Sequence, residues 1–470
     1  MKTVLVALTL ITAAGLSTPL PRGHSSLAQP SLALTGVTII DGSGAPPVPR
    51  MTVVIADGRI REIGPDESVL APAGAKIVDV AGQYLIPGLW DMHAHIGSNN
   101  VPALTGLFLA NGVTGVRDMG DSMDAINQWR SASDTDGRPC PRIIACGPFV
   151  TGPNPANPAI SVIVTNEAEA RRAVADLKER GADFIKVYNS LSRESFLAVA
   201  DEAKKSRIPF AGHVPDSVSA AEASDAGIAS IEHLTGILIA CSSNETELRG
   251  QRAASLSGKY GNKSFPSFLR AHARQTVDTY SEKKAAALFS RFVKNQTWQV
   301  PTLTVLRAVN ILDDCFFTVD PWLKFKSPGS RKDPPAGETA AIKKVFQKNL
   351  EIVGAMHRAG VLIMAGTDIP YSFTGFGIHD ELSLLVQAGL SPMEAIQAAT
   401  IQPARFLGLG AVLGTIEAGK KADLLLLQAD PLEDITNSRK IVGVVAAGRY
   451  LSKTDLSALR ARGEAELRRN

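Results

Sequence analysis

The stretch PGLWDMHAH, residues 87–95, joins an apolar run to two histidines that lie two positions apart. In an extended segment, residues two apart point to the same face, so the imidazoles of His93 and His95 can converge on one point. The apolar run before them is typical of a buried strand. We therefore expect a strand that ends in a pair of metal-binding histidines.

Short apolar runs and amphipathic stretches alternate on the C-terminal side of this strand. Eight strands with helical connections are the number needed for a closed (β/α)8 TIM-type barrel, an α/β fold, which we assign to residues 85–409. The expected strands are Leu85–Trp90, Gly115–Arg117, Arg142–Ala145, Phe184–Val187, Phe210–Gly212, Ser230–Ile231, Gln299–Leu303 and Val361–Ala365. The connection Arg307–Thr339 is unusually long and is expected to lie over the mouth of the barrel.

Both ends of the mature chain have a different pattern, that of short β segments separated by turns. Thr52–Ile55 is followed by Asp57-Gly58, a hairpin signal, and β-type runs return at Ala422–Leu427 and Ile441–Ala446. We therefore expect a small β-sandwich domain that is formed from residues 29–84 and 410–470.

The first 28 residues have the pattern of a signal peptide. Lys2 precedes the apolar run Val4–Leu16, and Ser26-Leu27-Ala28 offers small residues for cleavage. The alternative is a membrane anchor, but the run is shorter than the roughly 20 residues that span a bilayer. We expect a secreted or periplasmic protein without stable membrane insertion.

The composition restricts the class of partner. The 470 residues include 49 lysines and arginines and 46 acidic residues, which gives a net charge of only +3. This balance argues against nucleic acid as a partner and leaves a small-molecule substrate as the expectation. It leaves open whether the chain forms an oligomer.

Three more polar residues end predicted strands, namely His213, His233 and Asp368. The C-terminal ends of barrel strands are where TIM-type barrels place their active sites. A single histidine at a strand end is more often structural than a ligand. Four histidines and an aspartate at the same edge instead predict a site for a divalent metal.

Lys186 is the unusual member of this set because it lies within a predicted apolar strand. A buried ammonium without a partner is costly, so such a lysine should lose its charge or find a counter-ion. The neutral amine can react with CO₂ to give a carbamate, which acts as a carboxylate. The alternative is a lysine that reaches the surface or pairs with Asp183.

These residues resemble the amidohydrolase superfamily, in its branch of secreted dipeptidase-like and imidazolonepropionase-related enzymes. The resemblance covers nearly the whole mature chain. The motifs that carry it are Thr38-Ile39-Ile40-Asp41-Gly42, residues 87–95, Ile185-Lys186-Val187-Tyr188, Ala211-Gly212-His213, Ile231-Glu232-His233-Leu234, Ala365-Gly366-Thr367-Asp368 and Gly419-Lys420-Lys421-Ala422-Asp423-Leu424.

The resemblance implies a centre of two divalent metal ions, with zinc as the first expectation and manganese or another metal also compatible. It implies that one metal is held by His93, His95 and Asp368 and the other by His213 and His233. A CO₂-derived carbamate on Lys186 would bridge the two. The nucleophile would be a hydroxide between the metals, and Asp368 would orient it and pass its proton to the leaving nitrogen.

Two residues outside the metal set are candidates for contact with the substrate. Tyr188 follows Lys186 by two positions, so it points the same way and could bind the tetrahedral oxyanion. Its alternative is a tyrosine of the barrel core. His379 follows the Asp368 strand and could contact the substrate, although a structural role at a helix start is the alternative. For Arg117-Asp118, an internal ion pair that braces the barrel is favoured over a substrate contact.

The function we expect is hydrolysis of an amide or peptide-like C–N bond in a dipeptide or an N-acyl amino acid. One alternative is a single-metal deaminase or imidazolonepropionase that acts on a ring C–N bond. Such relatives carry a glutamate three residues after the fifth-strand histidine, where this chain has Asp216. The same barrel could also support a lactone or ester hydrolase, or a binding protein without catalytic activity.

Overall fold

The computed structural model describes residues 31–96, 101–135, 140–155, 157–257, 272–310, 338–368 and 375–467. The predicted signal peptide, residues 1–28, therefore lies outside the described residues, as does most of the connection that we expected over the barrel mouth. Among the helices that the structure does describe, none combines the length and the apolar character that a membrane crossing requires.

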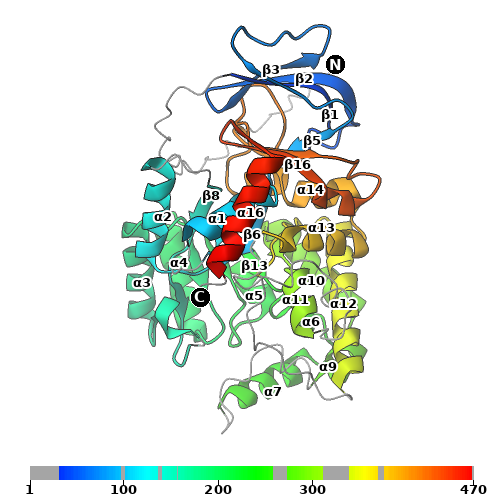
Figure 1. Cartoon of the computed structure of the whole chain (residues 1–470). Coiled ribbons are helices and arrows are strands. Elements are labelled where there is room, and N and C mark those ends of the chain that lie inside the picture. The colour runs from blue at the N-terminus through cyan, green and yellow to red at the C-terminus, as the bar shows by residue number, and fades with distance from the viewer. Residues whose placement is uncertain are drawn as a thin grey trace, which may run out of the picture.

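Strands from the two ends of the chain form one continuous sheet at the top of Figure 1. Asp57 and Gly58 both have positive φ, 52° and 71°, as the two central residues of a type I′ hairpin turn require. The sheet has the order β17-β16-β15-β5-β1-β2-β3, with β4 also paired to β1. Its strands are β1 (Leu32–Ile39), β2 (Val48–Ala56), β3 (Arg59–Pro65), β4 (Lys76–Asp79), β5 (Tyr84–Pro87), β15 (Leu424–Leu427), β16 (Ile441–Ala446) and β17 (Arg449–Ser452).

The barrel consists of parallel strands whose backbone hydrogen bonds complete a ring. The strands are β6 (Leu89–Ala94), β7 (Val113–Asp118), β8 (Arg142–Ala145) with its continuation β9 (Phe149–Thr151), β11 (Ile185–Val187), β12 (Phe210–Gly212), β13 (Ser230–Glu232) and β14 (Trp298–Val300). The extended segment 361–365 completes the ring. The Gln299 N–H donates to Leu362 O at 2.9 Å, and the Met92 N–H donates to Ala365 O at 2.9 Å. The predicted α/β barrel with a small β domain is thereby confirmed.

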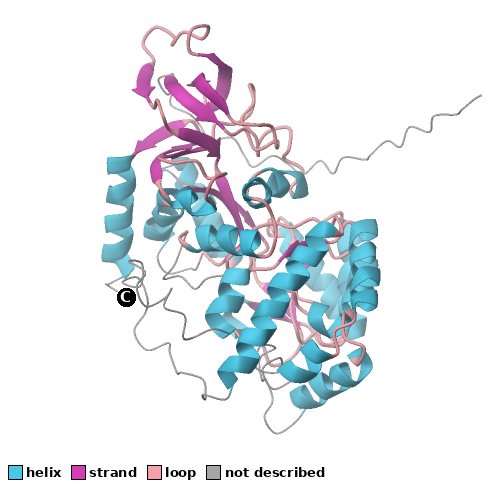
Figure 2. Cartoon of the chain, turned by 90° about the vertical axis from the view of Figure 1, so that its right-hand side faces the viewer, coloured by secondary structure: helices cyan, strands magenta, loops and turns pink. Residues whose placement is uncertain are grey.

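Helices surround the strands, as Figures 1 and 2 show. One of them, α14, begins with a complete capping box, which Ser391 and Glu394 form. The helices are α1 (Val101–Ala110), α2 (Met123–Thr135), α3 (Glu167–Glu179), α4 (Arg193–Ser206), α5 (Ala220–Asp225), α6 (Ile237–Ala240), α7 (Glu245–Ser257), α9 (Ala273–Asp278), α10 (Glu282–Asn295), α11 (Leu303–Asn310), α12 (Glu338–Arg358), α13 (Gly377–Gln387), α14 (Pro392–Ala398), α15 (Ile401–Phe406) and α16 (Lys453–Leu467). Three shorter elements are η1 (Pro158–Ile160), β10 (Ser161–Ile163) and η5 (Ile435–Arg439).

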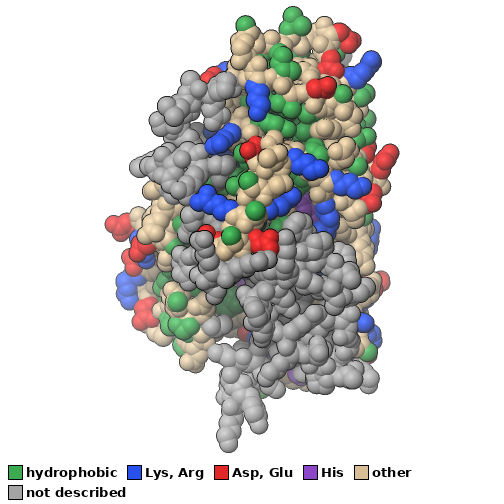
Figure 3. All heavy atoms as spheres, in the orientation of Figure 1, with side chains coloured by type: hydrophobic (Ala, Val, Ile, Leu, Met, Phe, Trp, Pro, Cys, Tyr) green, Lys and Arg blue, Asp and Glu red, His purple; other side chains and the backbone are tan. Residues whose placement is uncertain are grey.

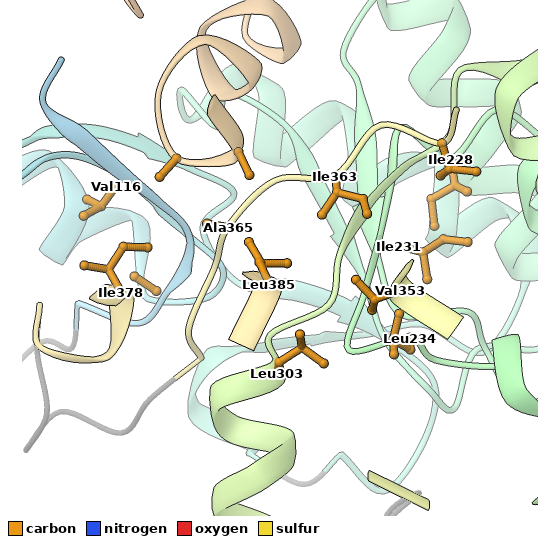
Figure 4. Packing of buried hydrophobic residues seen from close by; sticks show 14 of the residues in the cluster. Val116, Ile228, Ile231, Leu234, Leu303, Val353, Ile363, Ala365, Ile378 and Leu385 are labelled. Carbon is orange, nitrogen blue, oxygen red and sulfur yellow. The ribbon is translucent and has the colours of Figure 1, made fainter. Parts of the chain in front are cut away.

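The core lies between the barrel strands and their helices. Figure 4 shows Ile231 of β13 and Ile363 of the closing segment close to Val353 of α12, and all three side chains are buried. On the outer surface, basic and acidic side chains both appear on the face shown in Figure 3, in keeping with the near balance of charge. A packed interior of this kind leaves the strand ends as the place where polar side chains gather.

One contact in the barrel gives a test of the strand packing. A Cβ atom added at Gly115 of β7 would lie 2.2 Å from Cε2 of Trp90 in β6. We expect Gly115→Ala to destabilise the protein by about 1–3 kcal/mol, since an extra carbon forces apart a close-packed core. The matched control is Gly250→Ala in α7, where a Cβ meets nothing within 4 Å. Thermal unfolding should show a lower Tm for the first variant only, and equal values would contradict the packing described.

Candidate metal centre

The six residues predicted as metal ligands all lie at the C-terminal ends of barrel strands. His93 is in β6 and His95 directly follows it, while Lys186 is in β11. His213 and His233 immediately follow β12 and β13, and Asp368 follows the closing segment 361–365. Because the strands are parallel, these ends meet at one edge of the barrel, and the side chains come together there.

The distances show that three of the histidines surround the carboxylate of Asp368. The Asp368 Oδ1 atom lies 3.2 Å from His95 Nε2 and 3.6 Å from His93 Nε2, and its Oδ2 lies 3.6 Å from His233 Nε2. Ligand atoms of His93, His233 and Asp368 all lie within 4.8 Å of one another. His213 completes the group, with its ring centroid 4.8 Å from that of His233.

All four histidines are anchored through the same ring nitrogen, Nδ1. His93 contacts Glu232 Oε2 at 2.8 Å, His95 contacts Gly120 O at 3.3 Å, His213 contacts Asn189 Oδ1 at 2.7 Å, and His233 contacts Thr302 Oγ1 at 2.7 Å. The Thr302 hydroxyl donates its own hydrogen to Pro301 O, so its oxygen must accept from His233. Since every partner is an acceptor, each Nδ1 must carry the proton and each Nε2 must carry the lone pair.

The inward nitrogens fit a metal. The Nε2 atoms of His93 and His213 are buried and have no hydrogen-bond partner within the described part of the chain. Buried polar atoms rarely remain unsatisfied unless they serve a ligand. Nitrogen and carboxylate ligands of this kind suit zinc and similar divalent ions.

Burial also keeps these imidazoles neutral. Desolvation, followed by the nearby charges of His233 and Lys186, holds the pKa of His93 and of His213 well below the usual range. Desolvation is likewise the main cause that lowers the pKa of His233 to about 4. Neutral imidazole is the form that binds metals, so His93, His213 and His233 need no deprotonation step before binding.

Lys186 lies beside this group with only 2% of its surface exposed. Its Nζ atom is 5.6 Å from the ring centroid of Phe149 and 5.7 Å from that of Tyr188. Burial lowers the pKa of this amine. Asp183, the alternative partner, is bonded instead to Arg130 and to the Ala145 N–H, so the pairing with Lys186 is not formed.

The two candidate substrate residues have different surroundings. Tyr188 lies between Phe149 and His213, with ring centroids 4.6 Å and 4.2 Å away, and thus borders the metal group. His379, in contrast, is buried in α13, with Nδ1 bonded to Ser438 Oγ and Nε2 to Asn111 O, both at 3.0 Å. Asn111 precedes β7, so His379 faces the opposite end of the barrel, and our expectation of a substrate contact is corrected to a structural role.

The internal ion pair expected for Arg117 exists, but its partner differs from the neighbouring Asp118. Arg117 Nη2 lies 2.7 Å from Glu232 Oε1, and both side chains are essentially inaccessible. Asp118 instead accepts from the N–H groups of Ile96 and Gly120. Glu232 also contacts Nδ1 of His93, so the ion pair with Arg117 fixes the carboxylate that orients this histidine.

Sequence reasoning missed the side chains that hold the imidazoles, namely Glu232, Asn189 and Thr302. One of them lies next to a predicted ligand, since Glu232 directly precedes His233. That proximity was the available signal. Nothing in the sequence indicates Thr302, which lies 69 positions from the histidine it contacts.

A parallel barrel with histidine and aspartate side chains gathered at its strand ends has the arrangement of the class of TIM-barrel enzymes. Within that class, the chain belongs to the amidohydrolase family, whose model matches residues 84–451. It is 24% identical over 422 residues to a dihydroorotase of Trichlorobacter lovleyi, covering 82% of this chain and 86% of that protein.

Solved structures give the same result. A candidate prolidase from Bifidobacterium longum has 26% identity and a TM-score of 0.65, over 92% of this chain and 99% of that one. The bottromycin amidohydrolase shares the fold, with a TM-score of 0.69 and 23% identity over 93% of this chain and 90% of that one. The chain is therefore a hydrolase that acts on C–N bonds, in a family whose members generally bind divalent metals.

Proposed function

We propose that this enzyme hydrolyses the amide or peptide-like C–N bond of a small substrate, with dipeptides and N-acyl amino acids as the first candidates. The observation that carries the proposal is the set of four histidines, each held by an acceptor at Nδ1, three of which have Nε2 within 3.6 Å of the Asp368 carboxylate. The neighbour at 26% identity carries the name prolidase, and this supports peptide-type substrates.

In this proposal His93, His95 and Asp368 would hold one divalent ion, and His213 and His233 would hold a second. Lys186 would contribute to both positions as a carbamate, formed when its neutral amine bonds to CO₂ and loses a proton, which gives the charge of a carboxylate. Two such cations, when bound, lower the pKa of a water molecule toward neutrality and polarise the scissile carbonyl.

The chain's own residues then have distinct tasks. The Asp368 carboxylate accepts a proton from the attacking water and returns it to the leaving nitrogen. The Tyr188 hydroxyl donates a hydrogen bond to the oxyanion that forms on the substrate carbonyl. The partners at Nδ1 keep the four imidazoles in one tautomer and orientation throughout.

The surroundings of Asp216 favour two metals over the single-metal alternative. Its carboxylate is bound by Arg252, with Nε 2.8 Å from Oδ1 and Nη2 3.1 Å from Oδ2. A carboxylate whose two oxygens are both engaged by a guanidinium is held away from a substrate. This position therefore lacks the group that the single-metal chemistry uses.

Metal removal and reconstitution test the proposal. We expect about two equivalents of divalent metal per chain, loss of turnover after dialysis against a chelator, and recovery with zinc or manganese. The reconstituted enzyme is then tested on dipeptides, N-acyl amino acids and lactones, with metal content measured by elemental analysis. One equivalent or none would contradict the two-metal centre, and turnover of lactones alone would contradict the C–N specificity.

A further inference from the structure

Asp91 is a buried carboxylate in β6 for which the proposed mechanism has no use. Only 1% of its surface is exposed, and no described lysine or arginine forms an ion pair with it. A charged group in such a place is costly unless its hydrogen bonds are complete. Its partners therefore indicate what it does.

The hydrogen bonds of Asp91 go to two residues next to or within the metal centre, His93 and Thr367. Oδ1 accepts from the His93 N–H at 3.1 Å and from the Thr367 N–H at 3.0 Å. Oδ2 accepts from the Thr367 hydroxyl at 2.6 Å, a short and well-placed bond. The carboxylate thus ties the strand of the paired histidines to the turn that carries Asp368.

That turn needs such a restraint. Asp368 has a φ of 48°, in the left-handed region that residues other than glycine rarely adopt. Its N–H donates to His93 O at 2.7 Å, and a Cβ at Gly366 would lie 2.8 Å from His93 N. The turn is therefore wrapped closely around His93, and a conformation of this kind persists only where the surrounding structure fixes it.

We propose that Asp91 is a positioning residue, with the Thr367 hydroxyl as its principal partner. Its carboxylate holds the Asp368 turn against His93, so that the Asp368 carboxylate and the His93 imidazole approach the same metal position from neighbouring strands. Asp91 itself touches neither metal nor substrate. This inference rests on the proposed metal centre, because its effect is exerted on two of the proposed ligands.

The test replaces the hydroxyl of Thr367 without changing the shape of the side chain. Thr367→Val removes the bond to Asp91 Oδ2, and Thr367→Ser, the matched control, retains it. We expect the Val variant to lose about 10–100-fold in zinc affinity, the cost of removing a partner of a metal ligand. The Ser variant should stay within about threefold of the wild type, because its hydroxyl can make the same bond. Affinity is measured by competition with a chromophoric chelator.

Kinetics at saturating zinc separate positioning from a general loss of stability. A displaced Asp368 should lower kcat of the Val variant while KM stays within about threefold of the wild type. A role in folding alone would lower Tm and leave both zinc affinity and kcat unchanged, and that result would overturn the inference. If the Val variant does not fold, Asp91→Asn is measured in the same way and decides the matter. Failure of the wild type to bind zinc would instead refute the proposed function.

Discussion

Lys186→Ala is expected to lose at least about 100-fold in kcat/KM, more than the removal of a residue that only supports a ligand. The bound metal should fall from about two equivalents to one or none, since nothing else would join the two positions. The reason lies in the surroundings of the amine: Lys186 is 2% exposed, and its burial favours the neutral form that can bond to CO₂. Steady-state kinetics and elemental analysis of the purified variant measure both effects.

A second variant separates the carbamate from the space that it fills. Lys186→Met retains much of the side-chain volume but has no amine, so a small carboxylate cannot enter. The Ala variant leaves room, and added acetate or propionate should restore part of its activity and metal content. The Met variant should not respond. Turnover by Lys186→Ala equal to that of the wild type would refute the bridging role of this residue.

Arg117→Met is expected to destabilise the protein by about 3–5 kcal/mol, because it leaves a buried charge without its partner. The guanidinium donates to Glu232 Oε1 at 2.7 Å, to Ser230 Oγ at 2.9 Å and to Met92 O at 2.7 Å. Its central carbon also lies 5.4 Å from the ring centroid of Phe184 and 5.3 Å from that of Phe406. All of these interactions would be lost at once.

The control for this substitution is a solvent-accessible ion pair. Arg130→Met removes the partner of Asp183, where the two side chains are 29% and 38% exposed. We expect a change of no more than about 1 kcal/mol there, because such pairs are screened by water. Denaturant unfolding measures both variants. Equal free energies of unfolding for the two variants would disprove the large contribution of the Arg117–Glu232 pair to stability.

The barrel could be predicted from the sequence because its strands are short apolar runs that end in polar side chains. The bounds of β8 and β12 agree with the expected strands at Arg142–Ala145 and Phe210–Gly212. The predicted ligands come together for the same reason, since parallel strands bring their C-terminal ends to one edge. The local sequence pattern was sufficient to predict a side chain's place wherever that place depends only on its position in a strand.

The rest depended on contacts that no local pattern encodes. His379 follows the Asp368 strand, but the path of α13 brings it to Asn111, 268 positions away. Arg117 is adjacent to Asp118 in sequence yet pairs with Glu232, 115 positions along the chain. His233, Thr302 and Asp368 have positive φ without being glycine, and this backbone strain is imposed by tertiary contacts.

The pairing of β5 with β15 has a consequence for the folding of the strand that carries His93. Leu424–Leu427 pairs with Tyr84–Pro87, and the Gly88 N–H donates to Asp423 O at 2.8 Å, immediately before the strand that carries His93. This part of the barrel is therefore anchored to residues that lie far along the chain from it. Contacts so distant along the chain form slowly. During synthesis, His93 and His95 are therefore made long before β15, and the strand that carries them lacks this anchor until β15 has been added.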